Sequence, residues 1–220
     1  MRTDPDRRSL KNQNRPEIPR KTVYRLSVYL RCLQRLRANG IQTVSSEVLA
    51  KGAGVKSAQL RKDLAYFGQF GTRGLGYEVE LLAKMLSAHL GTSRLQQVIL
   101  VGVGNLGRAL LSYKGFQQEG FEIIGAFDAD PNRDRTKDAC LPPICSMEEL
   151  CGFLRKKKVK MAIIAVPATA AQAVANELVK NKIVGILNFS PAVLQVPNDV
   201  VVNNVNLAIE LENLSYFVHV

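Results

Sequence analysis

The 220-residue sequence has no tryptophan and only two histidines, His89 and His219. Its cysteines also number only four and show no C-x-x-C spacing: Cys32, Cys140, Cys145 and Cys151. Without that spacing or a cluster of histidines, we expect free thiols rather than a disulfide framework or a bound metal. This scarcity of ligands argues against a zinc site and favours a reducing compartment.

Long apolar runs are also absent. No stretch reaches the roughly 20 apolar residues that span a bilayer. The N-terminus is polar and rich in arginine, without the apolar core of a signal peptide. The sequence therefore predicts a cytoplasmic protein with no membrane partner.

Acidic residues are scarce in the first part of the chain. Residues 1–90 hold 17 Lys/Arg and 7 Asp/Glu, a net charge of +10, whereas residues 91–220 hold 13 and 12, a net charge of +1. Residues 1–19 are polar and punctuated by proline, which predicts a disordered basic arm. A basic segment joined to a neutral one favours a polyanion-binding domain attached to a second domain.

Three short helices are predicted after the arm. Apolar residues at helical spacing predict a helix over 22–38, and Ser45 or Ser46 can cap a second helix that ends near Lys51. Residues 52–55 form a glycine-containing turn, and Ser57 is expected to cap a third helix over 58–67. This arrangement is typical of a helix-turn-helix.

The third predicted helix offers one apolar and one polar face. Its polar side chains could read DNA: Gln59 and Arg61 at base edges, Lys62 at phosphates. Residues 68–79 alternate glycine with aromatic and basic residues, as in a hairpin wing with Arg73 at its tip. The candidate contacts with double-stranded DNA are Ser57, Gln59, Arg61, Lys62, Arg73, Gly74 and Gly76. An ordinary solvated helix face is the alternative. We place the winged-helix domain at 20–91, with a linker after the helix 80–90.

A second domain is predicted over residues 95–205. The strand Val98–Val101 turns abruptly into Gly102-Val-Gly-Asn-Leu-Gly107 and then into a helix over 105–113. In such a loop the first glycine permits the turn, the second admits a pyrophosphate and the third brings the helix close to the strand. Further apolar strands follow over 121–127, near 144, and over 161–166, 184–189 and 200–202, alternating with helices. This pattern predicts an α/β fold, a Rossmann-type doubly wound parallel sheet.

An acidic residue follows the second strand of this domain. Asp128 lies 26 residues after Gly102, close to the spacing of a carboxylate that accepts hydrogen bonds from an adenosine ribose. A carboxylate there repels a 2′-phosphate, which favours NAD over NADP. Asp130 is an alternative for the same role.

Catalytic motifs are missing. The two histidines lie near the linker and the chain end, and no Ser-His-Asp order, H-E-x-x-H or Cys-His cluster occurs. The nucleotide domain leaves no length for a substrate domain, so we expect no catalytic residues and no enzyme. Residues 206–220 show apolar helical spacing. This helix either packs on its own domain or is exchanged with a second subunit, since helix-turn-helix proteins usually dimerise.

Across about residues 17–218 the sequence resembles the redox-sensing transcriptional repressor Rex family. The motifs that carry the resemblance are Val44-Ser-Ser-Glu-Val-Leu-Ala50, Leu60-Arg-Lys-Asp-Leu-Ala-Tyr-Phe-Gly68, Gly71-Thr-Arg-Gly-Leu-Gly-Tyr77, Gly102-Val-Gly-Asn-Leu-Gly107, Val166-Pro167, Gly185-Ile-Leu-Asn-Phe-Ser-Pro191 and Glu210-Leu-Glu-Asn-Leu-Ser-Tyr-Phe217. The resemblance implies a homodimeric repressor that binds inverted-repeat operators and releases them when NADH binds, while NAD⁺ competes without causing release. It also implies that the last helix is exchanged.

Carried onto this chain, the resemblance implies a cofactor site for NADH or NAD⁺ made by Gly102, Val103, Gly104, Asn105, Leu106, Gly107, Tyr113, Asp128, Val166 and Pro167. Tyr113 would sense the nicotinamide. The family usually has Asp where this chain has Asn206, and that Asp switches between a tyrosine and an arginine at the position of Arg31. A neutral amide cannot make that charged pair, which predicts weaker coupling. The alternative is a constitutive DNA-binding regulator whose nucleotide domain is structural or senses another ligand such as CoA.

Overall fold

The computed structural model describes residues 18–71, 74–131 and 141–219. The chain divides into two compact units, Met1–Arg94 and Leu95–Val220, each of which is described by itself. Arg73, Cys140, most of the predicted basic arm and most of the loop after Pro131 lie outside the described residues.

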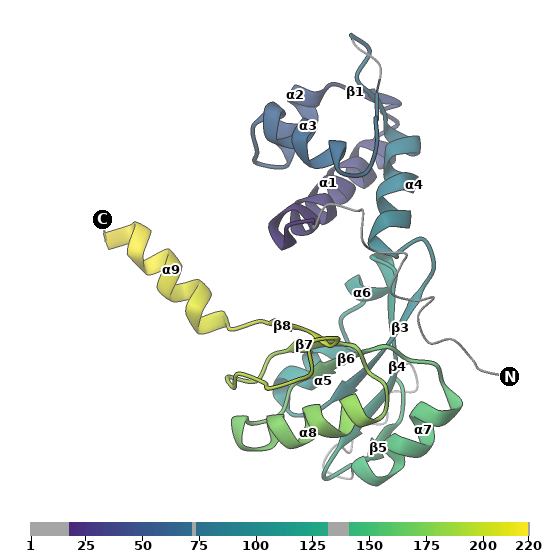
Figure 1. The fold of residues 1–220 in the computed structure, drawn as a ribbon, viewed down its shortest axis with the longest axis vertical. Helices are drawn as coiled ribbons and strands as arrows, with labels where there is room; N and C mark the ends of the chain where they lie inside the picture. The colour runs from purple at the N-terminus through teal and green to yellow at the C-terminus, as the bar shows by residue number, and fades with distance from the viewer. Residues whose placement is uncertain (1–17, 72–73, 132–140, 220) are drawn as a thin grey trace, which may run out of the picture. The chain divides into compact units, whose positions relative to one another are not determined.

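In its described residues, the first unit is built of four helices and a two-stranded ribbon (Figure 1). Its elements are α1 (Arg20–Ala38), β1 (Thr43–Val44), α2 (Ser46–Gly52), α3 (Ser57–Ala65), β2 (Tyr77–Glu78) and α4 (Val79–Leu90). Their apolar faces form one buried cluster, in which Leu26 and Leu33 of α1, Leu60 of α3 and Leu86 of α4 are all buried. Each such leucine contributes about 1.5–3 kcal/mol by leaving water. The predicted helix-turn-helix is therefore present as α2 and α3.

The two serines expected to cap α2 and α3 behave differently. Ser45 caps α2 as predicted, since its hydroxyl accepts the backbone N–H of Val48 at 3.2 Å. Ser57, however, does not cap α3: it is the first helical residue, and the N-cap is Lys56, whose backbone is extended and whose side chain makes no capping hydrogen bond. The expectation of a serine cap at that position was wrong because the chain enters the helix one residue earlier.

The wing pairs differently from a self-contained hairpin. Strand β2 is antiparallel to β1, with Thr43 opposite Glu78 and Val44 opposite Tyr77. The described end of the glycine-rich segment therefore pairs with β1, the strand before α2, and not with a strand within 68–71. Gly76 has a φ of 81°, and a Cβ on it would collide with the carbonyl of Val44. Close backbone approach thus explains glycine at this position.

The second unit holds a six-stranded sheet in the order β5-β4-β3-β6-β7-β8, and every neighbouring pair is parallel. The chain starts in the middle at β3, runs outward to β5, returns beside β3 with β6 and runs outward again. That order confirms the predicted Rossmann-type fold and places a switch point between β3 and β6. The strands are β3 (Gln96–Val101), β4 (Phe121–Asp128), β5 (Ile144–Ser146), β6 (Met161–Ile164), β7 (Gly185–Asn188) and β8 (Val201–Asn204).

Helices cover both faces of this sheet (Figure 1). Ile99 and Val101 of β3 join the core that holds residues of α7 and α8, whereas Val98 and Leu100 join a second core beside α5 and α6. Because successive strand residues point to opposite faces and both faces are covered, the strand reads as a continuous apolar run. The helices are α5 (Asn105–Leu111), α6 (Gly115–Gln118), α7 (Leu150–Lys156) and α8 (Ala168–Lys180), with a 3-10 turn at Met147–Glu149.

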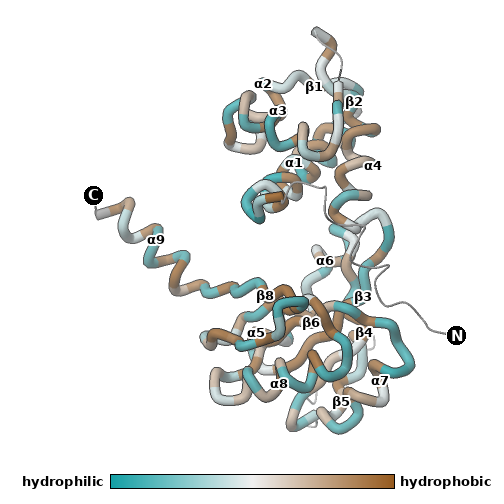
Figure 2. The backbone as a smooth tube through the Cα atoms, in the orientation of Figure 1, coloured by the Kyte–Doolittle hydropathy of each residue, from teal (hydrophilic) through white to brown (hydrophobic). Residues whose placement is uncertain are grey.

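The last helix, α9 (Leu207–His219), buries none of its described side chains. Every side chain from Leu207 to Val218 is exposed, including Leu211 at 67% and Phe217 at 77%. Figure 2 shows apolar residues recurring along this helix. The helix therefore does not pack on its own unit. Of the two alternatives predicted for it, packing on its own domain is wrong.

Cys32, Cys145 and Cys151 are free thiols. No helix in the described part of the chain is long and apolar enough to cross a membrane. Within the same residues, no group of three or more His, Cys, Asp or Glu side chains is arranged to hold a metal ion.

Candidate nucleotide-binding and DNA-binding sites

Two of the three loop glycines are required by the fold itself. Gly102 has a φ of 96°, and a Cβ on it would lie 2.5 Å from the carbonyl oxygen of Ala165. A Cβ on Gly107 would collide with the carbonyl of Gly102. The first glycine thus makes the turn and the third lets α5 approach β3, as the spacing predicted.

The packing of the domain does not require the middle glycine. Gly104 has a φ of −70°, which any residue adopts, and a Cβ on it would meet nothing within 4 Å. The protein's own packing therefore leaves this place open. Gly104 is also the N-cap of α5 and offers no side chain to the first-turn N–H groups. An open backbone in front of unsatisfied N–H groups suits a phosphate, which explains glycine at this position.

Asp128 lies directly beside the loop. Its Oδ2 accepts the backbone N–H of Val103 at 2.6 Å, and its Oδ1 accepts that of Asp130 at 2.9 Å. The backbone N–H of Gly102 donates to Phe127 O at 2.8 Å, so β4 and the loop are joined by backbone as well. Asp128 is thus the carboxylate at the loop, while Asp130 is a turn residue that donates to it. The carboxylate retains acceptor lone pairs for a ribose.

The same edge of the sheet gathers residues from β6 and β7. The backbone N–H of Ala165 donates to Val101 O at 2.8 Å, which places Val166 against Gly102, and Pro167 is the N-cap of α8. Beyond β7, the buried hydroxyl of Ser190 has no hydrogen-bond partner among the described residues. An orphaned buried hydroxyl at the carboxyl edge of a doubly wound sheet is suited to a ligand. Composition and spacing gave no signal for Ser190, which lay only inside a family motif.

The predicted switch residues are spread over both units. Tyr113 follows α5, is 60% exposed and contacts Phe116 edge-on at 5.1 Å. It is separated from the glycine loop by the whole of α5, about 10 Å of helix. Arg31 lies on α1 in the first unit and is exposed. Asn206 caps α9, since its Oδ1 accepts the backbone N–H groups of Ala208 at 3.0 Å and Ile209 at 3.4 Å.

On α3 the predicted DNA-contacting residues differ in their freedom. Lys62 is exposed. Arg61 is exposed too, but its Nη1 donates to Ser46 Oγ at 2.9 Å and lies 3.8 Å from Glu47 Oε1, both on α2. Gln59 is half-buried, and its Nε2 donates to Asp63 Oδ1 at 2.8 Å. One of the two amide hydrogens of Gln59 is therefore already in use.

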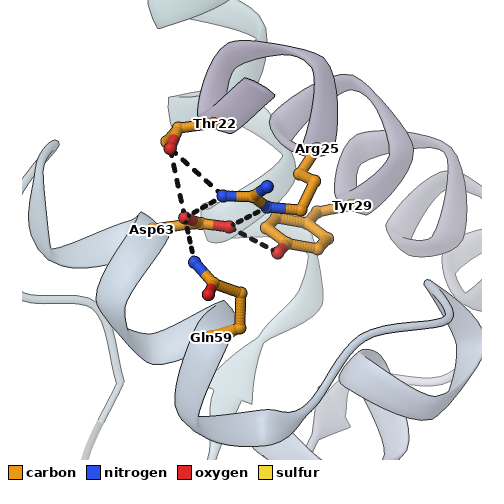
Figure 3. Close-up of polar contacts among 5 residues, drawn as sticks. All are labelled: Thr22, Arg25, Tyr29, Gln59 and Asp63. Atoms are coloured by element: carbon orange, nitrogen blue, oxygen red, sulfur yellow. Dashed lines mark hydrogen bonds and ion pairs between the residues drawn. The ribbon is translucent and has the colours of Figure 1, made fainter. Parts of the chain in front are cut away.

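Asp63 anchors α3 to α1 through a buried polar cluster (Figure 3). The carboxylate is fully buried and accepts two hydrogen bonds from Arg25, at 2.6 and 2.7 Å, and one from Tyr29 at 2.7 Å. Thr22 and Gln59 complete its partners. Bidentate Arg–carboxylate pairs are strong and directional, so this cluster fixes how α3 packs on α1.

The cluster also shifts the pKa values of its members. Burial by itself raises the pKa of Asp63, but the hydrogen bonds from Arg25, Tyr29 and Gln59 outweigh burial and hold that pKa below its usual value. Burial and the hydrogen bond to Asp63 raise the pKa of Tyr29 well above its usual range. Asp63 is therefore ionised and Tyr29 neutral at physiological pH. Sequence analysis missed this cluster, since its bonds to α1 join residues 34 to 41 positions apart.

A helix-turn-helix unit followed by a Rossmann-type unit with an open glycine loop defines a class of DNA-binding proteins that carry a nucleotide-binding domain. The family described as Putative DNA-binding protein N-terminus matches residues 17–65, and that described as CoA binding domain matches residues 93–192. The redox-sensing transcriptional repressor Rex of Pelotomaculum thermopropionicum is 50% identical over 91% of this chain and 93% of its own length. That of Streptomyces coelicolor is 46% identical over 90% of this chain and 77% of its own. The chain belongs to the Rex family of redox-sensing transcriptional repressors.

Solved structures of a Rex-family repressor share the fold of this chain. The crystal structure of RSP in complex with β-NAD⁺ and operator DNA has a TM-score of 0.85 at 35% identity, covering 92% of this chain and 93% of that chain. The complex of RSP with β-NADH has a TM-score of 0.81 at 33% identity, covering 92% and 95%. RSP is itself described as a Rex-family repressor. The fold predicted from the sequence is confirmed.

Proposed function

We propose that this chain is a transcriptional repressor that binds operator DNA through α2 and α3 and releases it when NADH occupies the loop Gly102–Gly107. One observation carries the nucleotide half of the proposal: Gly104 is glycine at a place where the fold neither needs it nor fills the space. The relatives support the coupling, since RSP is described both with NAD⁺ on operator DNA and with NADH. We also propose that the chain acts in the cytoplasm as a regulator and not as an enzyme.

Proposed contacts follow from the two sites. Arg61, Lys62 and Arg73 meet the DNA, with Ser57, Gly74 and Gly76 bringing backbone near it. The pyrophosphate meets the loop, including Val103, Asn105 and Leu106, and Asp128 binds the adenosine ribose. Tyr113, Val166 and Pro167 are assigned to the rest of the cofactor. When bound, the nicotinamide cofactor supplies only its redox state as a signal, and the chain's residues bind it without consuming it.

The second candidate ligand is a CoA species, because the family that matches residues 93–192 is described as a CoA binding domain. Asp128 is expected to discriminate between NADH and CoA. Its carboxylate suits a ribose with free hydroxyls and repels one that carries a phosphate, as the adenosine ribose of both CoA and NADPH does. Calorimetric titration should give tight binding of NADH and much weaker binding of NADPH and CoA. Tight CoA binding without NADH binding would replace this part of the proposal.

The two kinds of loop glycine predict opposite outcomes. Gly104→Ala should change the free energy of unfolding by less than about 1 kcal/mol, because its Cβ meets open space and the poorer N-cap is offset by the lower entropy of the unfolded chain. It should nevertheless weaken NADH binding at least tenfold by intruding on the phosphates. Gly107→Ala should lower thermal stability by forcing α5 away from Gly102. Thermal unfolding and NADH titration of both variants check this. Unaltered NADH affinity in Gly104→Ala would show that no ligand occupies the open space.

We propose that the chain forms a homodimer through residues 206–220. The exposed apolar side chains of α9 support this, since a helix that is apolar and unpartnered on its own unit calls for a partner surface. Light scattering of the intact chain should give a dimer, and Leu211→Glu/Phe217→Glu should give monomers. Glu210→Gln/Glu212→Gln, on the same helix, is the matched control and should remain dimeric. A monomeric intact chain would contradict the assignment.

Asn206 offers a test of coupling strength. Asn and Asp both cap helices well, so Asn206→Asp should keep the cap on α9 while adding the negative charge that the family pattern has. We expect NADH to release DNA from this variant at least as steeply as from the natural chain, with a coupling gain on the order of tenfold, within the usual range of allosteric coupling. The coupling is measured from DNA-release curves of the two proteins, compared at equal fractional saturation with NADH. A loss of coupling would show that the amide itself is part of the switch.

A further inference from the structure

A basic hollow lies at the edge of the second unit's sheet opposite the glycine loop. The second unit is formally neutral, with 12 Lys/Arg and 12 Asp/Glu in residues 95–220. Half of those cations line a single hollow of about 440 Å³, and none of its described lining residues is acidic. The six are Arg155, Lys157, Lys158, Lys160, Lys180 and Lys182.

The place of this hollow separates it from the nucleotide site. Lys160 immediately precedes β6, and Lys182 comes shortly before β7, so both stand at the amino ends of parallel strands. The loop at Gly102, in contrast, follows the carboxyl end of β3. The cations therefore do not serve the pyrophosphate of a nucleotide held at the loop.

The sheet itself brings the two basic segments together. The backbone N–H groups of Val184 and Gly185 both donate to the carbonyl oxygen of Lys160, each at 3.0 Å. These bonds hold the run Lys157–Lys160 beside the run Lys180–Lys182. The gathering of charge is thus built into the fold and does not depend on the swing of long side chains.

Lys182 occupies a backbone position that favours glycine. Among the described residues it is the one non-glycine with a positive φ, 69°. It follows Asn181, the C-cap of α8, and the N–H groups of Lys182 and Ile183 close the helix on Val179 O and Leu178 O. Helices commonly end with glycine in this conformation. A side chain kept where the backbone strains against it points to a use for that side chain.

Helix capping accounts for only part of the cluster. Arg155 lies in the last turn of α7 and Lys180 in that of α8, where cations are stabilised by the helix dipole. Lys157 is the C-cap of α7, and the other three lie beyond the helix caps. Within the described residues, only Lys180 of the six has an acidic partner, Glu177 at 3.8 Å. Like charges gathered around one hollow repel one another, and a bound anion relieves that repulsion.

We propose that this hollow is a second polyanion-binding surface, which takes the phosphate backbone of duplex DNA outside the contacts made by α3. The inference rests on the proposed DNA-binding function for its choice of polyanion. The apolar lining residues Leu154 and Val159 are buried, so the surface offers cations without the exposed apolar side chains by which proteins enter a lipid interface. Lysines without fixed partners suit sequence-independent phosphate contacts.

The test is the salt dependence of binding to long duplex DNA of random sequence. In the full-length double variant Lys158→Gln/Lys182→Gly, the slope of log affinity against log salt should fall by about 2, since each phosphate that is no longer neutralised lowers it by about 0.9. The matched control Lys84→Gln/Lys114→Gln removes two exposed charges outside the hollow and should keep its slope. Calorimetric NADH affinity should be the same in all three proteins.

Lys182→Gly alone gives a second readout. Removing the strained side chain should raise the unfolding midpoint by about 2 °C, while the affinity for long DNA falls. A more stable variant with unchanged DNA affinity would mean that Lys182 serves only the helix end, and would overturn the proposal. Equal slopes in the double variant and the natural chain would also overturn it. So would a double variant that loses binding to phosphatidylglycerol vesicles but keeps its DNA slope.

Failure of this inference can be told apart from failure of the proposed function. If the natural chain binds duplex DNA and only the slope comparison fails, the hollow is not a DNA surface while α3 still is. If the natural chain binds no duplex DNA at all, both proposals fall together.

Discussion

Asp128→Ala is expected to abolish the response to NADH at physiological cofactor concentrations while leaving DNA affinity intact. The variant loses the acceptor that we propose for the ribose hydroxyls, and hydrogen bonds to a charged group contribute about 1.5–3 kcal/mol each, or roughly ten- to a hundredfold in affinity. It also leaves the N–H of Val103 without the acceptor that holds it at 2.6 Å, which loosens the loop. The measurement is NADH affinity by calorimetry together with operator affinity in the absence of nucleotide.

Asp130→Ala provides the matched control. Asp130 is exposed, and only its backbone N–H, which the substitution keeps, donates to Asp128 at 2.9 Å. We therefore expect NADH affinity close to that of the natural chain. The ribose assignment fails if Asp128→Ala still releases DNA at the same NADH concentration, or if Asp130→Ala is the variant that does not.

Asp63→Ala should have the largest effect on the DNA-binding unit. Removing one partner of a buried ion pair typically costs 3–5 kcal/mol. We expect about 3 kcal/mol here, since the Arg25 side chain keeps 24% of its surface exposed and can reach water. Loss of the anchor between α1 and α3 should also weaken operator binding severalfold. Chemical denaturation followed by a probe in the first unit measures the stability, and a band shift measures the binding.

An exposed ion pair in the same unit is the control for Asp63. Glu80 contacts Arg37 at 3.3 Å and Lys84 at 3.2 Å, and all three side chains are exposed. Surface pairs contribute little to stability, so Glu80→Ala should leave the denaturation midpoint unchanged. Equal losses of unfolding free energy from the two substitutions would show that the buried cluster contributes no more to stability than an exposed ion pair.

The buried cluster around Asp63 should also affect the stability of the protein at acid pH. Because the pKa of Asp63 is lower in the folded protein than the value of about 3.9 in an unfolded chain, its contribution to stability is present above pH 3.9 and is lost as the pH falls through the folded value. Asp63→Asn should therefore flatten the acid limb of the stability curve below about pH 4. A limb of unchanged steepness would mean that other carboxylates govern acid unfolding.

The parts of the molecule that the sequence predicts well are local ones. The turn at Gly102 follows from the run of apolar residues that ends in glycine. The position of Asp128 beside this turn follows from its place at the end of the next strand. The parallel sheet could be predicted because buried strands are apolar on both faces, as Ile99 and Leu100 show.

The parts that sequence analysis missed depend on long-range contacts. Asp63 reads as an ordinary polar residue of a helix until Arg25 and Tyr29 are brought against it by the packing of α1. The pairing of β2 with β1 depends on how closely Gly76 approaches Val44, which no turn pattern encodes. The basic hollow exists only because the sheet places Lys160 beside Val184.

The most direct test of the account is a titration of the operator complex. An inverted-repeat duplex, selected from a random pool by the chain itself, is bound to saturation and then titrated separately with NADH, NAD⁺, NADPH and CoA. A switch requires that NADH prefer the DNA-free state by about 1–3 kcal/mol. We predict that NADH releases the duplex and that NAD⁺, NADPH and CoA do not. Full retention of the duplex at NADH concentrations that calorimetry shows to saturate the chain would contradict the account and leave a constitutive DNA-binding protein.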